Sequence, residues 1–242
     1  MPLALMGMFY FDPLYLMIFI PIMLLSLAAS GWVKSAYNTW SKVRNAEGLT
    51  GAEAARKILR AQGIDDVPVQ EVPGQLSDNY DPGKRIVHLS SDVFHGDSLA
   101  AVGVAAHEVG HAIQHAHQYA PLMLRRVMAP AVMLGQGFYM LLFIIGGVLL
   151  YGGNAQWGTW LILGGLACLA GLVLFSLITL PVEFDASFRA MNQLRTLAIL
   201  REDELIGVRK VLTAAAMTYV VGAISAIATL VYFLLRFSGR RD

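Results

Sequence analysis

The residues best suited to chemistry form one short motif, His107-Glu108-Val109-Gly110-His111. On an α-helix, residues four apart lie on the same face, so His107 and His111 can bind one metal ion. Glu108 lies about 100° round the helix axis, beside such an ion. Zinc held by neutral imidazoles lowers the pKa of a bound water toward about 7, and an adjacent carboxylate can accept its proton. The motif therefore predicts metal-activated hydrolysis with Glu108 as general base.

A third metal ligand has to come from elsewhere in the chain, because a catalytic zinc usually has three protein ligands. The single cysteine, Cys168, leaves no thiol pair for a metal site. Glu183 follows a long apolar segment, and Pro181 just before it suits the first turn of a new helix. Glu183 could also serve only the dipole of that helix. The downstream carboxylates are Glu183, Asp185, Glu202, Asp203 and Glu204.

The composition indicates a membrane protein. Of the 242 residues, 56% are hydrophobic and 14% charged, and the mean hydropathy is +0.56. The formal net charge of +1 gives no reason to expect nucleic acid as a partner. Four segments reach the length of about 20 residues that crosses a bilayer: residues 8–29, 127–151, 158–180 and 213–235. We interpret the first as a retained anchor, although Asp12, Pro13 and Pro21 interrupt it.

Between these segments lies a polar region with its own predicted elements. Thr50-Gly51-Ala52-Glu53 is a capping box ahead of a helix that ends near Gly63. Residues 67–72 and 85–90 are predicted to be two strands joined by a loop, in a hairpin. A helix from Asp97 or Ser98 to residue 119 should carry the histidine motif. Strand 85–90 could accept an extended substrate at its edge, or be an edge covered by the helix of residues 50–62.

Three longer stretches carry a resemblance to a known family. They are Gly48-Leu49-Thr50-Gly51, Ala106-His107-Glu108-Val109-Gly110-His111-Ala112-Ile113-Gln114-His115 and Leu180-Pro181-Val182-Glu183-Phe184-Asp185-Ala186-Ser187. With them, nearly the whole chain resembles the YugP-type family of prokaryotic membrane zinc metallopeptidases. The number and order of the apolar segments agree with that family too.

More distantly, the chain is similar to HtpX-type and CAAX-prenyl membrane proteases. In those proteins a second helix offers a Glu that completes the zinc site, with an Asp four residues later. The resemblance implies that Glu183 is the third zinc ligand, in a gluzincin-like arrangement. Ser187 stands where the relatives have Asp, so support for the ligands must come from Ser187, Asp185 or another group. Asp185 lies about 200° from Glu183 on a helix and should point away from the ion.

These features together predict a mainly α, multi-pass membrane protein with about four transmembrane helices and a small zincin-like α+β metallopeptidase domain at the membrane surface. The expected activity is that of a zinc-dependent endopeptidase acting on polypeptides, membrane proteins among them, with the oligomeric state left open. The predicted divisions are residues 1–31 for the first span, 32–126 for the metallopeptidase domain, 127–151, 158–180 and 213–236 for the other spans, and 181–212 for a helix with the third ligand.

The remaining four histidines are weaker candidates for a catalytic or substrate-binding role. His115 continues the face of His111, so it could contact substrate or stabilise an oxyanion, but it could equally complement the negative C-terminal end of its helix. His88, His95 and His117 have no predicted catalytic role.

The charge distribution predicts which side of the membrane the polar region occupies. Residues 127–151 and 158–180 form a hairpin, so residues 31–126 and 181–212 emerge on the same side. The positive-inside rule puts that side in the cytoplasm of a prokaryotic cell. Basic residues on this side are Lys34, Lys42, Arg44, Arg125, Arg126, Arg189 and Arg195, whereas Arg236, Arg240 and Arg241 oppose the assignment.

Two other functions are alternatives to this prediction. A site-two-type intramembrane protease usually carries a Leu-Asp-Gly ligand motif, which this sequence lacks, and the apolar run of residues 99–106 is too short to span a membrane. The other rival is a non-enzymatic, multi-span metal-binding scaffold.

Overall fold

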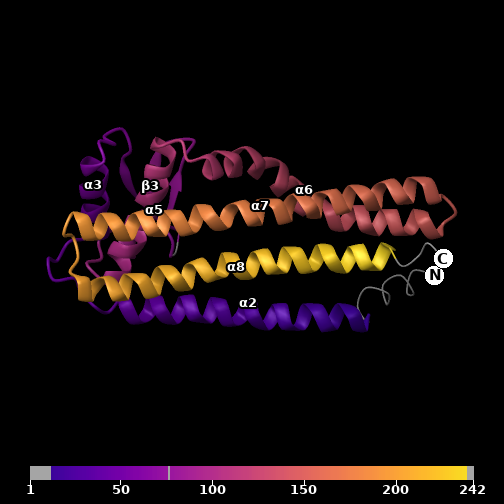
Figure 1. Ribbon diagram of the computed structural model, residues 1–242, viewed down its shortest axis with the longest axis horizontal. Coiled ribbons are helices and arrows are strands. Elements are labelled where there is room, and N and C mark those ends of the chain that lie inside the picture. The colour runs from indigo at the N-terminus through magenta and orange to yellow at the C-terminus, as the bar shows by residue number, and fades with distance from the viewer. Residues whose placement is uncertain (1–11, 76, 239–242) are drawn as a thin grey trace. The chain divides into compact units, whose positions relative to one another are not determined.

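The protein is mainly helical. A computed structural model describes residues 12–75 and 77–238, and in it four helices are long and apolar enough to cross a membrane (Figure 1). This confirms the expectation of four such segments. Residues 8–11 of the first predicted segment, and the basic residues Arg240 and Arg241, lie outside the described residues. The four helices are α2 (Pro13–Trp40), α6 (Ala120–Tyr151), α7 (Ala155–Thr196) and α8 (Glu202–Ser238).

The chain divides into two compact units, and each long helix contributes residues to both. The first, the helical unit, comprises Met1–Ala28, Leu124–Thr179 and Tyr219–Asp242. Its described core is rich in aromatic side chains and includes the buried Phe143, Tyr232 and Phe233. The second, the mixed unit, comprises Ala29–Met123 and Leu180–Thr218 and contains every described strand.

Helix α7 is continuous (Figure 1) and contains Pro181 in its interior, so the prediction that a new helix starts at Pro181 was wrong. A proline inside a helix removes one backbone hydrogen bond. The residues after it are well packed, since Val182 and Ala186 are fully buried, and this packing holds the helical path. Glu183 therefore lies in the interior of α7, far from the N-terminus of that helix. This excludes the alternative that Glu183 only stabilises the dipole at a helix N-terminus.

The mixed unit contains a three-stranded sheet whose connectivity differs from the prediction. Strands β1 (Val69–Val72) and β3 (Ile86–Ser90) agree with the two predicted strands, but they pair in parallel. A third strand, β2 (Asn79–Asp81), pairs antiparallel with β3, giving the order β1-β3-β2. Strand β3 is thus central, so both predictions that made residues 85–90 an edge strand were wrong. The two edge strands of the sheet are β1 and β2.

Helices α3 (Gly51–Ala61), α4 (Ser91–Phe94) and α5 (Leu99–Ala116) complete the mixed unit. The predicted capping box is confirmed: the Thr50 side chain accepts from the Glu53 amide, and the Glu53 carboxylate accepts from the Thr50 amide at 2.8 Å. Helix α5 begins after Ser98, whose hydroxyl accepts from the Ala101 amide at 3.1 Å. Ser98 is therefore the N-cap, one of the two residues predicted for that position.

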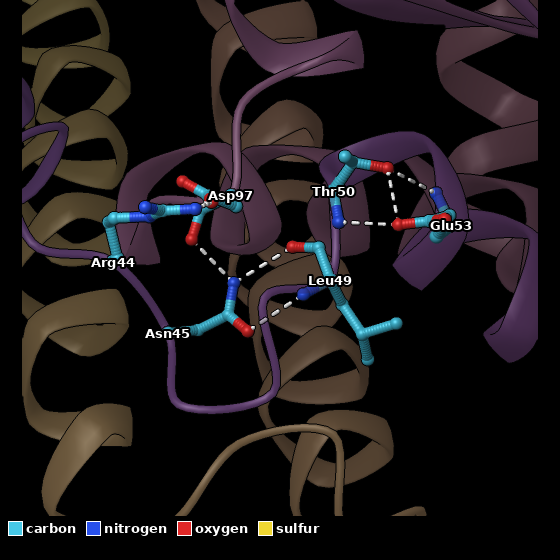
Figure 2. A network of polar contacts seen from close by, with 6 residues as sticks. All are labelled: Arg44, Asn45, Leu49, Thr50, Glu53 and Asp97. Carbon is cyan, nitrogen blue, oxygen red and sulfur yellow. Dashed lines mark hydrogen bonds and ion pairs between the residues drawn. The ribbon is translucent and has the colours of Figure 1, made fainter.

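A polar network fixes the segment before α3 against the turn before α5 (Figure 2). The Asn45 side chain donates to the carbonyl oxygens of Leu49 and Asp97, and its own oxygen accepts from the Leu49 amide at 3.0 Å. Arg44 forms an ion pair with the Asp97 carboxylate. Asn45 is almost fully buried, so these bonds satisfy polar groups that water does not reach. The network positions the start of the helix that carries the histidine motif.

Candidate metal centre

Helices α5 and α7 approach very closely at Gly110, the fourth residue of the motif. A Cβ atom at this position would lie 2.4 Å from the carbonyl oxygen of Ala186, closer than atoms can pack. Glycine is therefore required for the two helices to lie at this separation. The close approach brings His107 and His111 on α5 to Glu183 on α7.

Three side chains converge at this contact. The Nε2 atoms of His107 and His111 lie 3.4 Å and 3.7 Å from the same oxygen, Oε2 of Glu183. Zinc bound tetrahedrally, with Zn–N and Zn–O distances of about 2.0–2.2 Å, holds its ligand atoms about 3.4 Å apart. Glu183 is 2% exposed and His111 9% exposed. The donor types, their spacing and their burial fit a zinc ion.

Each histidine is oriented by a hydrogen bond at its other ring nitrogen. Nδ1 of His111 lies 3.0 Å from Oε1 of Gln114, and Nδ1 of His107 lies 3.1 Å from the hydroxyl of Ser187. An amide oxygen can only accept, so His111 donates from Nδ1 to Gln114, and its Nε2 is the ring nitrogen that faces Glu183. Such partners fix the tautomer and the ring orientation of metal-binding histidines.

Asp185 is not one of the three converging side chains. It is bonded to Gln114 instead. Its Oδ2 accepts from Gln114 Nε2 at 2.8 Å and from Arg189 Nε at 2.6 Å. The support that relatives draw from an aspartate is thus divided here: Ser187 contacts His107, and Asp185 reaches His111 through Gln114.

The electrostatics of the cluster favour positive charge. Burial alone lowers the pKa of His111, but the hydrogen bond with Glu183 and the charges of Glu108 and Glu183 outweigh burial and raise it. The carboxylates therefore stabilise a proton on this imidazole. A metal cation that replaces the proton meets the same field.

Glu108 is held beside the cluster by the edge strand. Its Oε2 accepts from the backbone amide of Tyr80, in the middle of β2, at 2.9 Å, and the residue is 9% exposed. The hydroxyl of Tyr80 lies 2.8 Å from Nδ1 of His115. His115 is thus found at the side of the site that β2 forms, in the last turn of α5, where both predicted roles stay open.

The other predicted carboxylates lie elsewhere. Glu202, Asp203 and Glu204 form the first turn of α8, where Glu202 pairs with Arg195 and Glu204 accepts from the Ala46 amide. Sequence reasoning missed Gln114 and Tyr80. The i, i+3 spacing of His111 and Gln114 was an available signal, because it places both residues on one helix face. Nothing in the sequence marked Tyr80.

Comparison with known proteins shows the family to which the chain is similar. Residues 15–238 match a family described as "Putative neutral zinc metallopeptidase". The chain is 44% identical over 231 residues to "Putative membrane protease YugP" of Bacillus subtilis (strain 168), an alignment that covers 93% of this chain and 99% of the relative. No solved structure matches.

The chain belongs to this family of zinc metallopeptidases. The predicted resemblance to the YugP-type family is thereby confirmed, and Zn²⁺ is the metal that the family and the cluster of His107, His111 and Glu183 both indicate.

Proposed function

We propose that this protein is a membrane-embedded zinc endopeptidase in which His107, His111 and Glu183 hold the metal and Glu108 is the general base. The observation that carries the proposal is the convergence of two imidazole Nε2 atoms on one buried carboxylate oxygen. Zinc bound there would activate a water molecule and polarise the peptide carbonyl. Fixed Nδ1 partners on both histidines support the assignment, because they direct the ring nitrogens toward the metal.

In the proposed mechanism, Glu108 accepts a proton from the attacking water and delivers it to the leaving amine. Glu108 follows His107 directly on α5, so its side chain points about 100° away round the helix axis. It is therefore not one of the three proposed metal ligands. The Tyr80 amide donates to Oε2 and so holds the carboxylate in one orientation. A positioned base of this kind contributes about 10²–10⁴-fold to the rate.

The proposed cleavage is internal, in an extended polypeptide, and there is a cavity near each end of β2. One cavity, of about 1030 Å³, is lined by residues that include Gln75 and Ser91. It lies near the start of β2, because Ser90, which precedes Ser91, donates its amide hydrogen to Asp78 just before that strand. The other, of about 660 Å³, includes Arg85 and His115, at the Asp81 end of the strand. Space at both ends of this strand would suit an extended polypeptide that is cleaved internally.

The proposed location is the membrane of a prokaryotic cell, with several spans and the mixed unit in the cytoplasm. The four apolar helices and the membrane protease relative support a membrane location. The basic residues counted by the positive-inside rule support the side. The proposed substrates are polypeptides, including membrane proteins. Helix α5 is not among the described helices that could span a membrane, which counts against a site-two-type protease.

Replacing Glu108 by glutamine tests the proposal. Purified Glu108→Gln should lose at least about 100-fold of its activity on labelled casein and on a library of quenched peptides. It should keep its zinc, measured by elemental analysis. The matched control is Glu47→Gln, which changes an exposed glutamate of the same unit and should leave both unchanged. Cleavage by Glu108→Gln at the wild-type rate would refute the mechanism, and absence of cleavage by the wild type would favour a non-enzymatic scaffold.

A further inference from the structure

Gln114 is a fully buried polar residue at the contact between α5 and α7. Its Oε1 accepts from Nδ1 of His111 at 3.0 Å. Its Nε2 donates to the carbonyl oxygen of Val182 and to Oδ2 of Asp185, both at 2.8 Å. A glutamine amide has two N–H donors, and both are used. Burial of this group is tolerated because every one of these bonds is made.

The two acceptors on α7 lie on either side of Glu183 in the sequence. Val182 precedes Glu183 directly, and Asp185 follows two residues later. Asp185 is held in turn by Arg189, whose guanidinium also donates to Nδ1 of His117, the residue after α5. One amide thus fixes the ring of His111 and the part of α7 that carries Glu183.

We infer that Gln114 is a positioning residue of the metal centre, with two separable tasks. Its oxygen keeps His111 in the tautomer whose Nε2 can bind zinc. Its nitrogen keeps α7 at the distance from α5 that places Glu183 within reach of both histidines. The inference rests on the proposed metal site and adds to it a residue that does not touch the ion.

Gln114→Met tests the whole role, since methionine has a similar length and makes none of these hydrogen bonds. The zinc affinity of the full-length protein in detergent, measured by competition with a chromogenic chelator, should fall by about 10–100-fold. The matched control is Gln193→Met. It removes the 3.0 Å bond between Gln62 and Gln193, which also joins α7 to another helix but is remote from the histidines. Its zinc affinity should stay within about twofold of wild type.

Gln114→Glu separates the two tasks and serves if Gln114→Met does not fold. Glutamate keeps an acceptor for His111 but loses both donors to α7. It should bind zinc more tightly than Gln114→Met, and its Co²⁺ form should give an absorption spectrum displaced from that of the wild type, because Glu183 is no longer held in place.

Four outcomes would overturn the inference. Wild-type zinc affinity in Gln114→Met, or equal losses in Gln114→Met and Gln193→Met, would remove Gln114 from the metal centre while leaving the proposed function standing. A wild-type Co²⁺ spectrum in Gln114→Glu would contradict the positioning of Glu183. Absence of zinc binding by the wild type would overturn the proposed metal site as well.

Discussion

At the scale of single residues, the hydrogen bonds of the two motif histidines matter as much as their spacing. His107 and His111 each have one ring nitrogen occupied by a side chain, and the other directed toward Glu183. Ser187 is the partner of His107, and its hydroxyl is neutral. An aspartate, which the resemblance to HtpX-type and CAAX-prenyl proteases implies at this position, would make a charge-assisted bond.

The contribution of Ser187 can be measured. Ser187→Ala removes the partner of His107 Nδ1 and should weaken zinc binding by about tenfold, while Ser187→Asp should match or exceed the wild type. Chelator competition provides the measurement. Ser176→Ala is the control, because Ser176 lies on the same helix and its hydroxyl donates to the Leu172 carbonyl within that helix. Unchanged affinity in Ser187→Ala would mean that His107 is oriented by other contacts.

The sequence could predict only part of this site. The i, i+4 spacing identified His107 and His111, because helix geometry alone places them together. Glu183 could be chosen over Asp185 only through the resemblance to known proteases, since 72 residues separate it from His111. The i, i+3 spacing places Gln114 beside His111, but its bonds to Val182 and Asp185 depend on how α7 packs against α5. Tyr80 could not be predicted because its role depends on how β2 packs against α5.

At the scale of elements, the site depends on how closely α5 and α7 pack. Gly110 faces the backbone of α7 at Ala186, with no flexible side chain between them that could move aside. Helix separation at this point decides whether Glu183 reaches the histidines. The motif glycine is therefore a packing requirement in addition to being part of the metal-binding pattern.

Gly110→Ala should push the two helices apart. We expect a destabilisation of about 1–3 kcal/mol from overpacking, together with loss of bound zinc. The control is Gly31→Ala on α2, where an added Cβ meets nothing within 4 Å and alanine favours the helix. Thermal unfolding in detergent and zinc content are the measurements. A Gly110→Ala protein with wild-type stability and full zinc would contradict the close approach.

Prediction of the elements succeeded where the signals were local and failed where they were not. The Thr50–Glu53 capping box and the Ser98 N-cap depend on neighbouring residues, and both were confirmed. Strand β2 was missed because Asn79, Tyr80 and Asp81 show no run of β-branched residues. Without it, β1 and β3 resembled a hairpin. Pro181 suggested a helix start because its packing within α7 could not be foreseen.

At the scale of the whole molecule, an even number of membrane spans puts both chain ends on one side. With the mixed unit in the cytoplasm, both ends should face away from it. A reporter that is active only in the cytoplasm should stay silent when fused to either terminus, and should be active when inserted after Gly74, an exposed position in the mixed unit. A cytoplasmic signal from either terminus would contradict four spans with this orientation.

The central claim is that one zinc ion is held jointly by the motif on α5 and by Glu183 on α7. Elemental analysis of purified protein, normalised to protein concentration, tests it most directly. The wild type should contain about one zinc per chain, and Glu183→Ala should lose most of it, as His107→Ala and His111→Ala do. A full zinc complement in a folded Glu183→Ala protein would contradict the account and place the third ligand elsewhere.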